Sequence, residues 1–197
     1  MAIEEPEFEI VGEFSDFEIR QYPPYIVAEV DVQGDSGKAD NSAFRILAGY
    51  IFGDNAAAEK MAMTAPVESR PSEKGEKMAM TAPVTATAGS DEGQTTYAFV
   101  MERKYTLDSL PVPNDERIRI RTVPEKTVAV RRYSGRWSQK NYLQHESTLL
   151  TALEANGIRT VGRPTLARYN SPFSLPLFRR NEVMIEIMPD TVAGLRE

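Results

Sequence analysis

The residues that could carry out chemistry are few in this chain. It has 197 residues, one histidine (His145) and no cysteine, so cysteine nucleophiles, disulfides and thiolate metal sites are excluded. A serine triad would have only His145 to use, and no serine lies in a nucleophile motif such as GxSxG. The sequence also contains no recognisable motif for a metal, a phosphate-binding loop or a dinucleotide. Any acid–base chemistry would therefore fall to carboxylates on predicted strands, for which Glu18, Glu29 and Glu102 are candidates.

One segment, residues 170–182, has the composition of a binding surface. It carries large apolar side chains and two prolines, followed by the pair Arg179–Arg180. A loop with two prolines cannot pair regularly as a strand, so its apolar side chains must bury against something else. They either cover the end of the protein's own core or hold an apolar ligand, whose carboxylates the arginines would suit. The pair Arg131–Arg132 likewise has two interpretations: solvated charges at the end of a strand, or a site for an anionic ligand. The apolar side chains of the segment are Phe173, Leu175, Leu177 and Phe178.

A nine-residue string, EKMAMTAPV, occurs at residues 59–67 and again at residues 76–84. In each copy Met, Met, Ala and Val alternate with Ala, Thr and Pro, which is the period of a strand. The polar stretch between the copies contains Pro71 and Gly75, as an exposed loop does. The pattern predicts two paired strands with their methionine side chains in the core, where flexible thioethers pack well. These methionines are Met61, Met63, Met78 and Met80.

A fainter repeat relates the two halves of the chain. Phe17–Gly34 and Ile118–Gly135 align without gaps and share six of eighteen residues, where about one match is expected from average usage. Each copy predicts a strand, a proline turn, a second strand and a glycine, followed by a helix at about 39–50 or 138–156. We therefore expect one domain over residues 1–197, built from pseudo-repeats at 8–109 and 116–189 with a connector at 110–115. The predicted class is α+β, a distorted antiparallel β-barrel with two flanking helices.

The overall composition is that of an ordinary globular protein, with 41% hydrophobic and 26% charged residues. The sequence contains no apolar run of membrane-spanning length, and its acidic first ten residues lack the features of a signal peptide. A net charge of −6 disfavours general nucleic-acid binding. We expect a cytoplasmic monomer without nucleic-acid or membrane partners.

The sequence resembles the SOUL haem-binding protein family over nearly its whole length, from about Phe8 to Ile187. The matching elements occur in the family's order: FEIRQYPPYIVAEV, AFRILAGYIFGDN, the duplicated KMAMTAPV, FVMERKYTLDSLPVPND, AVRRYSG and RRNEV. This resemblance implies a distorted β-barrel of duplicated halves flanked by two helices, similar to bacterial effector-binding domains. It also implies reversible, non-catalytic binding of haem or another tetrapyrrole, in the manner of a carrier or buffer.

The resemblance further implies where the ligand binds, namely in a groove between the first helix and the loop before the last strand. Phe44 and Leu47 lie three residues apart, so one helix face could present both to the ligand. Some family members have an axial histidine in the first half, where this chain has none. Binding would then need no histidine ligand, unless Tyr50, a methionine or His145 replaces it, and we expect His145 to be dispensable. The implied groove residues are Asn41, Phe44, Arg45, Leu47, Ala48, Tyr50, Phe173, Leu175, Leu177, Phe178, Arg179 and Arg180.

Besides a role as an interaction protein without a small ligand, two other functions fit the same residues. The first is an effector-binding module for another small organic ligand, held through a buried carboxylate. The second is a small-molecule hydrolase on the same fold, in which such a carboxylate acts as the base.

Overall fold

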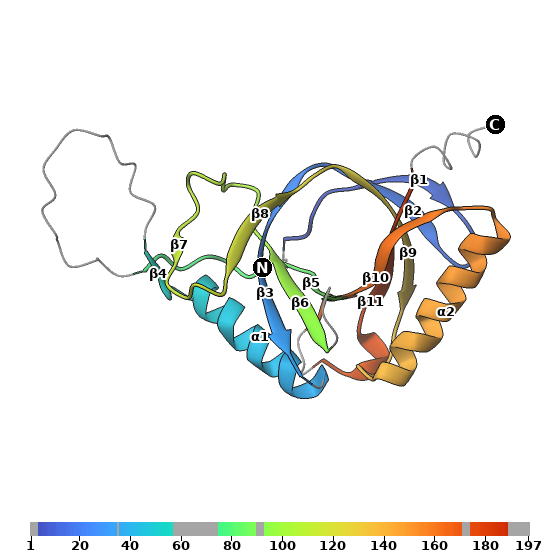
Figure 1. Ribbon diagram of the computed structural model, residues 1–197. Coiled ribbons are helices and arrows are strands. Elements are labelled where there is room, and N and C mark those ends of the chain that lie inside the picture. Colours follow the sequence, from blue (N-terminus) through green and yellow to red (C-terminus); the bar gives the residue numbers. More distant parts are fainter. Residues whose placement is uncertain (1–3, 35, 57–74, 90–92, 171–173, 189–197) are drawn as a thin grey trace, which may run out of the picture.

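The fold is a nine-stranded antiparallel sheet that curls into a half-barrel, with two α-helices on its outside (Figure 1). The computed structural model describes residues 4–34, 36–56, 75–89, 93–170 and 174–188. The strand order is β1-β2-β9-β11-β10-β5-β6-β3-β8, and β4 and β7 form a separate short pair. The predicted α+β class is confirmed. The elements are β1 (Glu9–Glu13), β2 (Glu18–Tyr22), β3 (Tyr25–Gln33), α1 (Ser36–Ile51), β4 (Asn55–Ala56), β5 (Val84–Ala88), β6 (Gln94–Val100), β7 (Val112–Pro113), β8 (Arg119–Val123), β9 (Lys126–Tyr133), α2 (Gln139–Ala155), β10 (Thr160–Arg168), the 3₁₀ turn η1 (Pro176–Phe178) and β11 (Asn181–Ile187).

The two predicted halves contribute to the sheet in an interleaved way. Both bounds of β8 lie 101 residues after those of β2, and β9 starts 101 residues after β3. Strand β2 of the first half pairs with β9 of the second, whereas β8 of the second half pairs with β3 of the first. Strands β5 and β10 pair at the centre. The two halves therefore form one continuous sheet, and the duplicated unit stays a prediction.

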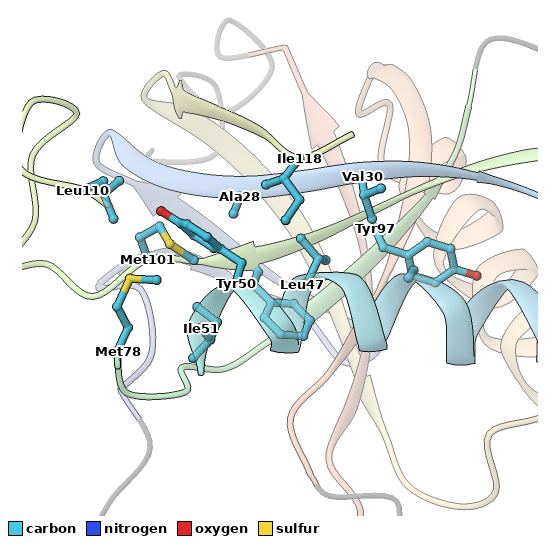
Figure 2. Packing of buried hydrophobic residues seen from close by; sticks show 12 residues of the cluster. Ala28, Val30, Leu47, Tyr50, Ile51, Met78, Tyr97, Met101, Leu110 and Ile118 are labelled. Carbon is cyan, nitrogen blue, oxygen red and sulfur yellow. The ribbon is translucent and has the colours of Figure 1, made fainter. Parts of the chain in front are cut away.

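The outer face of the sheet is covered by the helices, because each helix has one apolar stripe. Leu47, Tyr50 and Ile51 of α1 pack on Ala28 and Val30 of β3 (Figure 2). The core under α2 is a second cluster, built around Leu149 and Leu153 on the helix and Val183 and Ile185 on β11. None of the helices in the described ranges combines the length and the apolar character needed to cross a membrane.

Both predicted helices are present, and their ends follow from local chemistry. The side chain of Ser138 accepts a hydrogen bond from the Asn141 amide, which caps the N-terminus of α2. Gly157, with a φ of 68°, follows the C-cap of the same helix, in a conformation that glycine adopts without steric cost. Helix α2 therefore matches the predicted range within one residue at each end, while α1 starts three residues before its predicted range.

The strand prediction for the repeated nine-residue string is wrong for its second copy. The first copy, residues 59–67, lies outside the described residues. Residues 75–80 form no strand, and β5 begins only at Val84, the last residue of the second copy. The backbone is instead held by separate contacts: the Met78 amide donates to the Ile51 carbonyl at 2.8 Å, and the Ala82 amide donates to the Glu4 carbonyl at 2.8 Å. Burial does not alternate along this copy either: Met78 is buried in the core beneath α1, and Thr81, Ala82 and Pro83 are buried in succession.

Replacing Met78 by alanine is expected to lower the free energy of unfolding by about 2–5 kcal/mol, because a buried side chain is lost and a cavity remains. Met80 is only partly buried at the edge of the same cluster, so Met80→Ala should cost less. Urea unfolding of the two variants and the parent measures the difference. Equal losses in both variants would show that Met78 does not anchor this segment.

Candidate functional site

Four large apolar side chains are exposed on α1 and on the loop that contains η1. We call this set of residues the outer patch; it consists of Phe44, Leu175, Leu177 and Phe178. The side chains are 40%, 66%, 81% and 77% exposed, respectively. Figure 1 shows the loop with η1 beside the start of α2. Clustered large apolar side chains in water are unfavourable and typically mark a binding surface.

Local structure explains why the η1 side chains stay exposed. Pro176 is at the start of η1 and cannot donate to a sheet, and its carbonyl accepts a hydrogen bond from the Gly135 amide at 2.9 Å. This contact ties the turn to the segment that opens α2. Leu177 and Phe178 then project away from the sheet because the one-turn helix has no partner that covers them among the described residues.

Trp137 joins the two sides of the outer patch. Its indole N–H donates to the Asn181 side-chain oxygen at 2.7 Å, which fixes the ring. The Arg179 and Arg168 guanidinium groups lie 4.5 and 5.0 Å from the ring centroid. A small pocket of about 70 Å³ opens between the ring and Phe44. The pocket is lined by Phe44, Val84, Tyr97, Phe99, Trp137, Arg168 and Asn170.

The structure separates the predicted helix wall into two groups. Asn41, Phe44 and Arg45 lie on the exposed side of α1, whereas Leu47, Ala48 and Tyr50 are buried. The Tyr50 hydroxyl donates to the Pro111 carbonyl at 2.7 Å, and burial raises the pKa of this phenol. Figure 2 shows Leu47 and Tyr50 inside the core cluster. The expectation that Phe44 and Leu47 share one accessible face is therefore wrong.

The loop wall is also divided. Phe173 lies outside the described residues. The Arg179 Nε donates to the Ser174 carbonyl at 2.9 Å, so its guanidinium is held beside Trp137. Arg180 instead stacks on Tyr169 at 3.8 Å and donates to Glu182. The ligand-binding role of the remaining residues stays a prediction. Trp137 and Arg168 were not foreseen, although Trp137 is the single tryptophan of the chain.

Arg180 belongs to a buried ionic network on the inner face of the sheet. Glu182 accepts hydrogen bonds from Arg20 at 2.9 and 3.0 Å, from the Tyr169 hydroxyl at 2.6 Å and from the Arg180 Nε at 2.9 Å. Burial opposes its ionised form, yet Arg20, then Tyr169 and Arg180, hold the pKa of Glu182 below its usual value. A carboxylate with this many donors has little capacity left to act as a base.

The three candidate carboxylates named from the sequence are not brought together as a pair. Glu29 is buried and accepts from Arg119 at 3.2 Å and from Arg121 at 2.9 Å. Glu18 pairs with Arg20 at 2.5 Å. Glu102, just after β6, pairs with Lys104 at 3.2 Å. Three carboxylates in three different ion pairs do not form an acid–base pair.

His145 lies on α2 and is not among the residues that define the outer patch or line its pocket. Its ring stacks on Tyr133 with 4.2 Å between centroids, and its Nδ1 accepts a hydrogen bond from the Arg131 Nε at 3.3 Å. Burial and the Arg131 charge lower the pKa of His145 from 6.5. Arg131 also donates to Asp16 at 2.7 Å, so this basic residue stabilises the contact between β9 and the segment before β2.

The lowered pKa of His145 gives an expected pH dependence. The folded state disfavours the protonated ring, so this contribution to stability is fully present above about pH 6.5 and declines as the pH falls through the folded pKa. In His145→Gln the decrease in melting temperature between about pH 7.5 and about pH 5 should be smaller than in the parent. Thermal unfolding followed by circular dichroism measures it, and identical pH profiles would contradict the assignment.

Comparison with known proteins shows which family this sequence matches and which solved structures have a similar fold. The model of the family described as SOUL heme-binding protein matches residues 3–186. Among proteins with curated descriptions, none matches significantly. The EcmrR C-terminal domain superposes with a TM-score of 0.61 at 9% identity, over 92% of this chain and 98% of that one. A hydrolase from Listeria innocua superposes with a TM-score of 0.54 at 14% identity, over 95% and 94% of the two chains.

These two structures show a shared fold alone, because their identities are low. The family match is of a different kind, since it covers almost every residue from the start of the chain to the last strand. The chain therefore belongs to the SOUL heme-binding protein family.

Proposed function

We propose that this protein binds haem or a related tetrapyrrole reversibly on the outer patch, without catalysis, and acts as a cytoplasmic, monomeric carrier or buffer. The observation that carries the proposal is the set of exposed side chains Phe44, Leu177 and Phe178, together with Trp137, which lines a pocket with Phe44 and has Arg179 beside its ring. The family is a haem-binding one, and a tetrapyrrole needs a wide apolar surface next to cationic groups.

The residues present fit the face and the propionates of a tetrapyrrole. The apolar side chains would contact the macrocycle, while Arg179, Arg168 and the exposed Arg45 would hold its carboxylates. The pocket of about 70 Å³ can take only an edge of such a ligand, so the macrocycle would lie across the surface. No residue of the outer patch or of its pocket lining is a histidine or a methionine within the described ranges.

This geometry sets an expected affinity. Covering a few hundred Å² of apolar surface at about 25 cal/mol per Å² gives several kcal/mol, and association costs offset much of it. A dissociation constant on the order of micromolar follows. Iron should add little, because the outer patch and its pocket lining contain no histidine or methionine within the described ranges, and the phenol of that lining, Tyr97, is only 4% exposed.

The test is a titration with hemin followed by Soret absorbance, with protoporphyrin IX as the iron-free control. We expect saturation at one ligand per chain and similar affinities for the two compounds. Partition without saturation would contradict specific binding. A much weaker affinity for protoporphyrin IX would show that an iron ligand exists and that the proposed mode is wrong.

A hydrolase or an effector-binding module remains the alternative proposal. Either function would use a carboxylate inside the half-barrel. Glu29 and Glu182 are each bound by two arginines, which favours ionised structural carboxylates over reactive ones. The binding function is therefore better supported than the enzymatic one.

A further inference from the structure

A second cavity lies on the inner face of the sheet, opposite the outer patch. It has a volume of about 380 Å³, within the range of pockets that hold small organic ligands. Thr85 and Ala98 line it, whereas Val84 and Phe99 on the same strands line the pocket beside Trp137. Because successive strand residues point to opposite faces, the two sites are separated by the sheet.

The walls of the inner cavity combine aromatic rings with hydroxyl groups. Tyr22, Tyr25 and Tyr169 line it, and the rings of Tyr22 and Tyr25 lie 6.2 Å apart. Thr87 and Thr165 also line it and share a hydrogen bond of 2.7 Å across the central strand pair. Burial raises the pKa of Tyr25 to about 12, so this phenol stays a neutral donor. Such walls suit a small aromatic molecule with polar substituents.

The wall of the inner cavity carries more basic than acidic residues. Arg121, Lys126 and Arg163 line the cavity together with Glu29 and Glu186. Glu29 is already bound by Arg119 and Arg121, and Arg163 donates to the Gly89 carbonyl at 2.6 Å. Within the described ranges the Lys126 ammonium has no ion pair. Its nitrogen lies 5.7 Å from the centroid of the Tyr25 ring.

An unpaired ammonium in a partly desolvated space is unfavourable without an anion. Burial lowers the pKa of Lys126, the Glu186 charge opposes this effect and the Arg121 charge adds to it. A ligand carboxylate beside Lys126 would raise the pKa of the ammonium again, because it would replace the lost water and screen the charge of the Arg121 guanidinium.

We propose that the inner cavity is a second ligand site, for a small aromatic carboxylate whose carboxylate contacts Lys126 and whose ring lies among Tyr22, Tyr25 and Tyr169. The site does not depend on tetrapyrrole binding at the outer patch. Its preference for an anion follows from the three basic residues that line the cavity, Arg121, Lys126 and Arg163, against two carboxylates, Glu29 and Glu186, of which Glu29 is already bound by two arginines.

The experiment compares 1-naphthoate with the uncharged 1-naphthamide and the cationic 1-naphthylmethylamine, by calorimetric titration of the full chain. We expect 1-naphthoate to bind one-to-one and at least about tenfold more tightly than the other two, as a charge-assisted hydrogen bond would give. In Lys126→Met the preference for the carboxylate should disappear. The matched control, Lys104→Met, changes an exposed lysine outside the cavity and should keep it.

A second variant tests the cavity independently of charge. Ala98 lines the wall, and Ala98→Leu should fill part of the space and weaken both 1-naphthoate and 1-naphthamide. Phe178→Asp, on the outer patch, should leave both affinities unchanged and so separates this proposal from the tetrapyrrole proposal. Equal affinities for the three compounds, tighter binding of the amine, or an unchanged preference in folded Lys126→Met would each overturn the proposal.

Discussion

Replacing Arg20 by methionine is expected to lower the free energy of unfolding by about 3–5 kcal/mol, the usual effect of removing one partner of a buried ion pair. Arg20 is 3% exposed and Glu182 is fully buried, and the pair is joined by two hydrogen bonds. The ring of Phe8 lies 4.2 Å from the Arg20 guanidinium, so an apolar group borders the lost cation on that side. Urea denaturation measures the loss.

The matched control is Arg121→Met, at the position 101 residues after Arg20 in the second half. The Arg121 side chain is 51% exposed and pairs with Glu29, so its removal should cost at most about 1 kcal/mol. The pH dependence of stability in the acid range adds a second measurement. Because the pKa of Glu182 is below 4.5 in the folded state, its contribution is present above about pH 4.5 and is lost as the pH falls further. Similar losses for the two arginine variants would contradict the importance of the inner network.

Leu177→Asp is expected to weaken hemin binding roughly thirtyfold or more, because desolvating a carboxylate against an apolar macrocycle costs at least about 2 kcal/mol. Leu177 is 81% exposed, so its replacement should leave thermal stability almost unchanged. Phe178→Asp should have a similar effect. Soret titration of each variant against the parent measures the change.

Leu107→Asp is the control, since Leu107 is an exposed leucine of the loop after β6 and does not line the pocket beside Trp137. It should bind hemin as the parent does. Leu47→Asp is a useful contrast. Leu47 of α1 is fully buried in the core, so this variant should lose stability rather than affinity for hemin. Normal hemin binding by folded Leu177→Asp would remove the outer patch from the proposed function.

Much of the fold follows from patterns that are local in the sequence. The cap at Ser138, the glycine at Gly157 and the apolar stripe of α2 are all within one segment, and they define the helix. The spacing of 101 residues likewise locates four strands. The second copy of the nine-residue string shows the limit of such reasoning, because its alternation neither reveals whether a partner strand is available nor predicts the burial of Thr81 and Pro83.

The candidate site is less visible in the sequence, since it depends on which elements meet in space. The apolar loop around Leu177 stands out by composition. Whether a residue of α1 faces that loop or the sheet depends on helix rotation against β3 and β6, which the spacing of Phe44 and Leu47 does not fix. Arg20 and Glu182 are 162 residues apart, and no local pattern relates them. The inner cavity gathers its walls from strands of both halves and has no signature in any one segment.

The exchange of β2 and β8 between the halves has a consequence for synthesis on the ribosome. Glu18 of β2 aligns with Val130 of β9, so β2 emerges with only β1 available beside it. At translation rates of about 5–20 residues per second, its second neighbour follows roughly 5–20 seconds later. Until β9 has been synthesised, one edge of β2 is unpaired. Glu182, the ion-pair partner of Arg20, is synthesised later still. A nascent chain of this protein is therefore exposed to wrong strand pairing for most of its elongation, a period in which chaperone binding would be of most use.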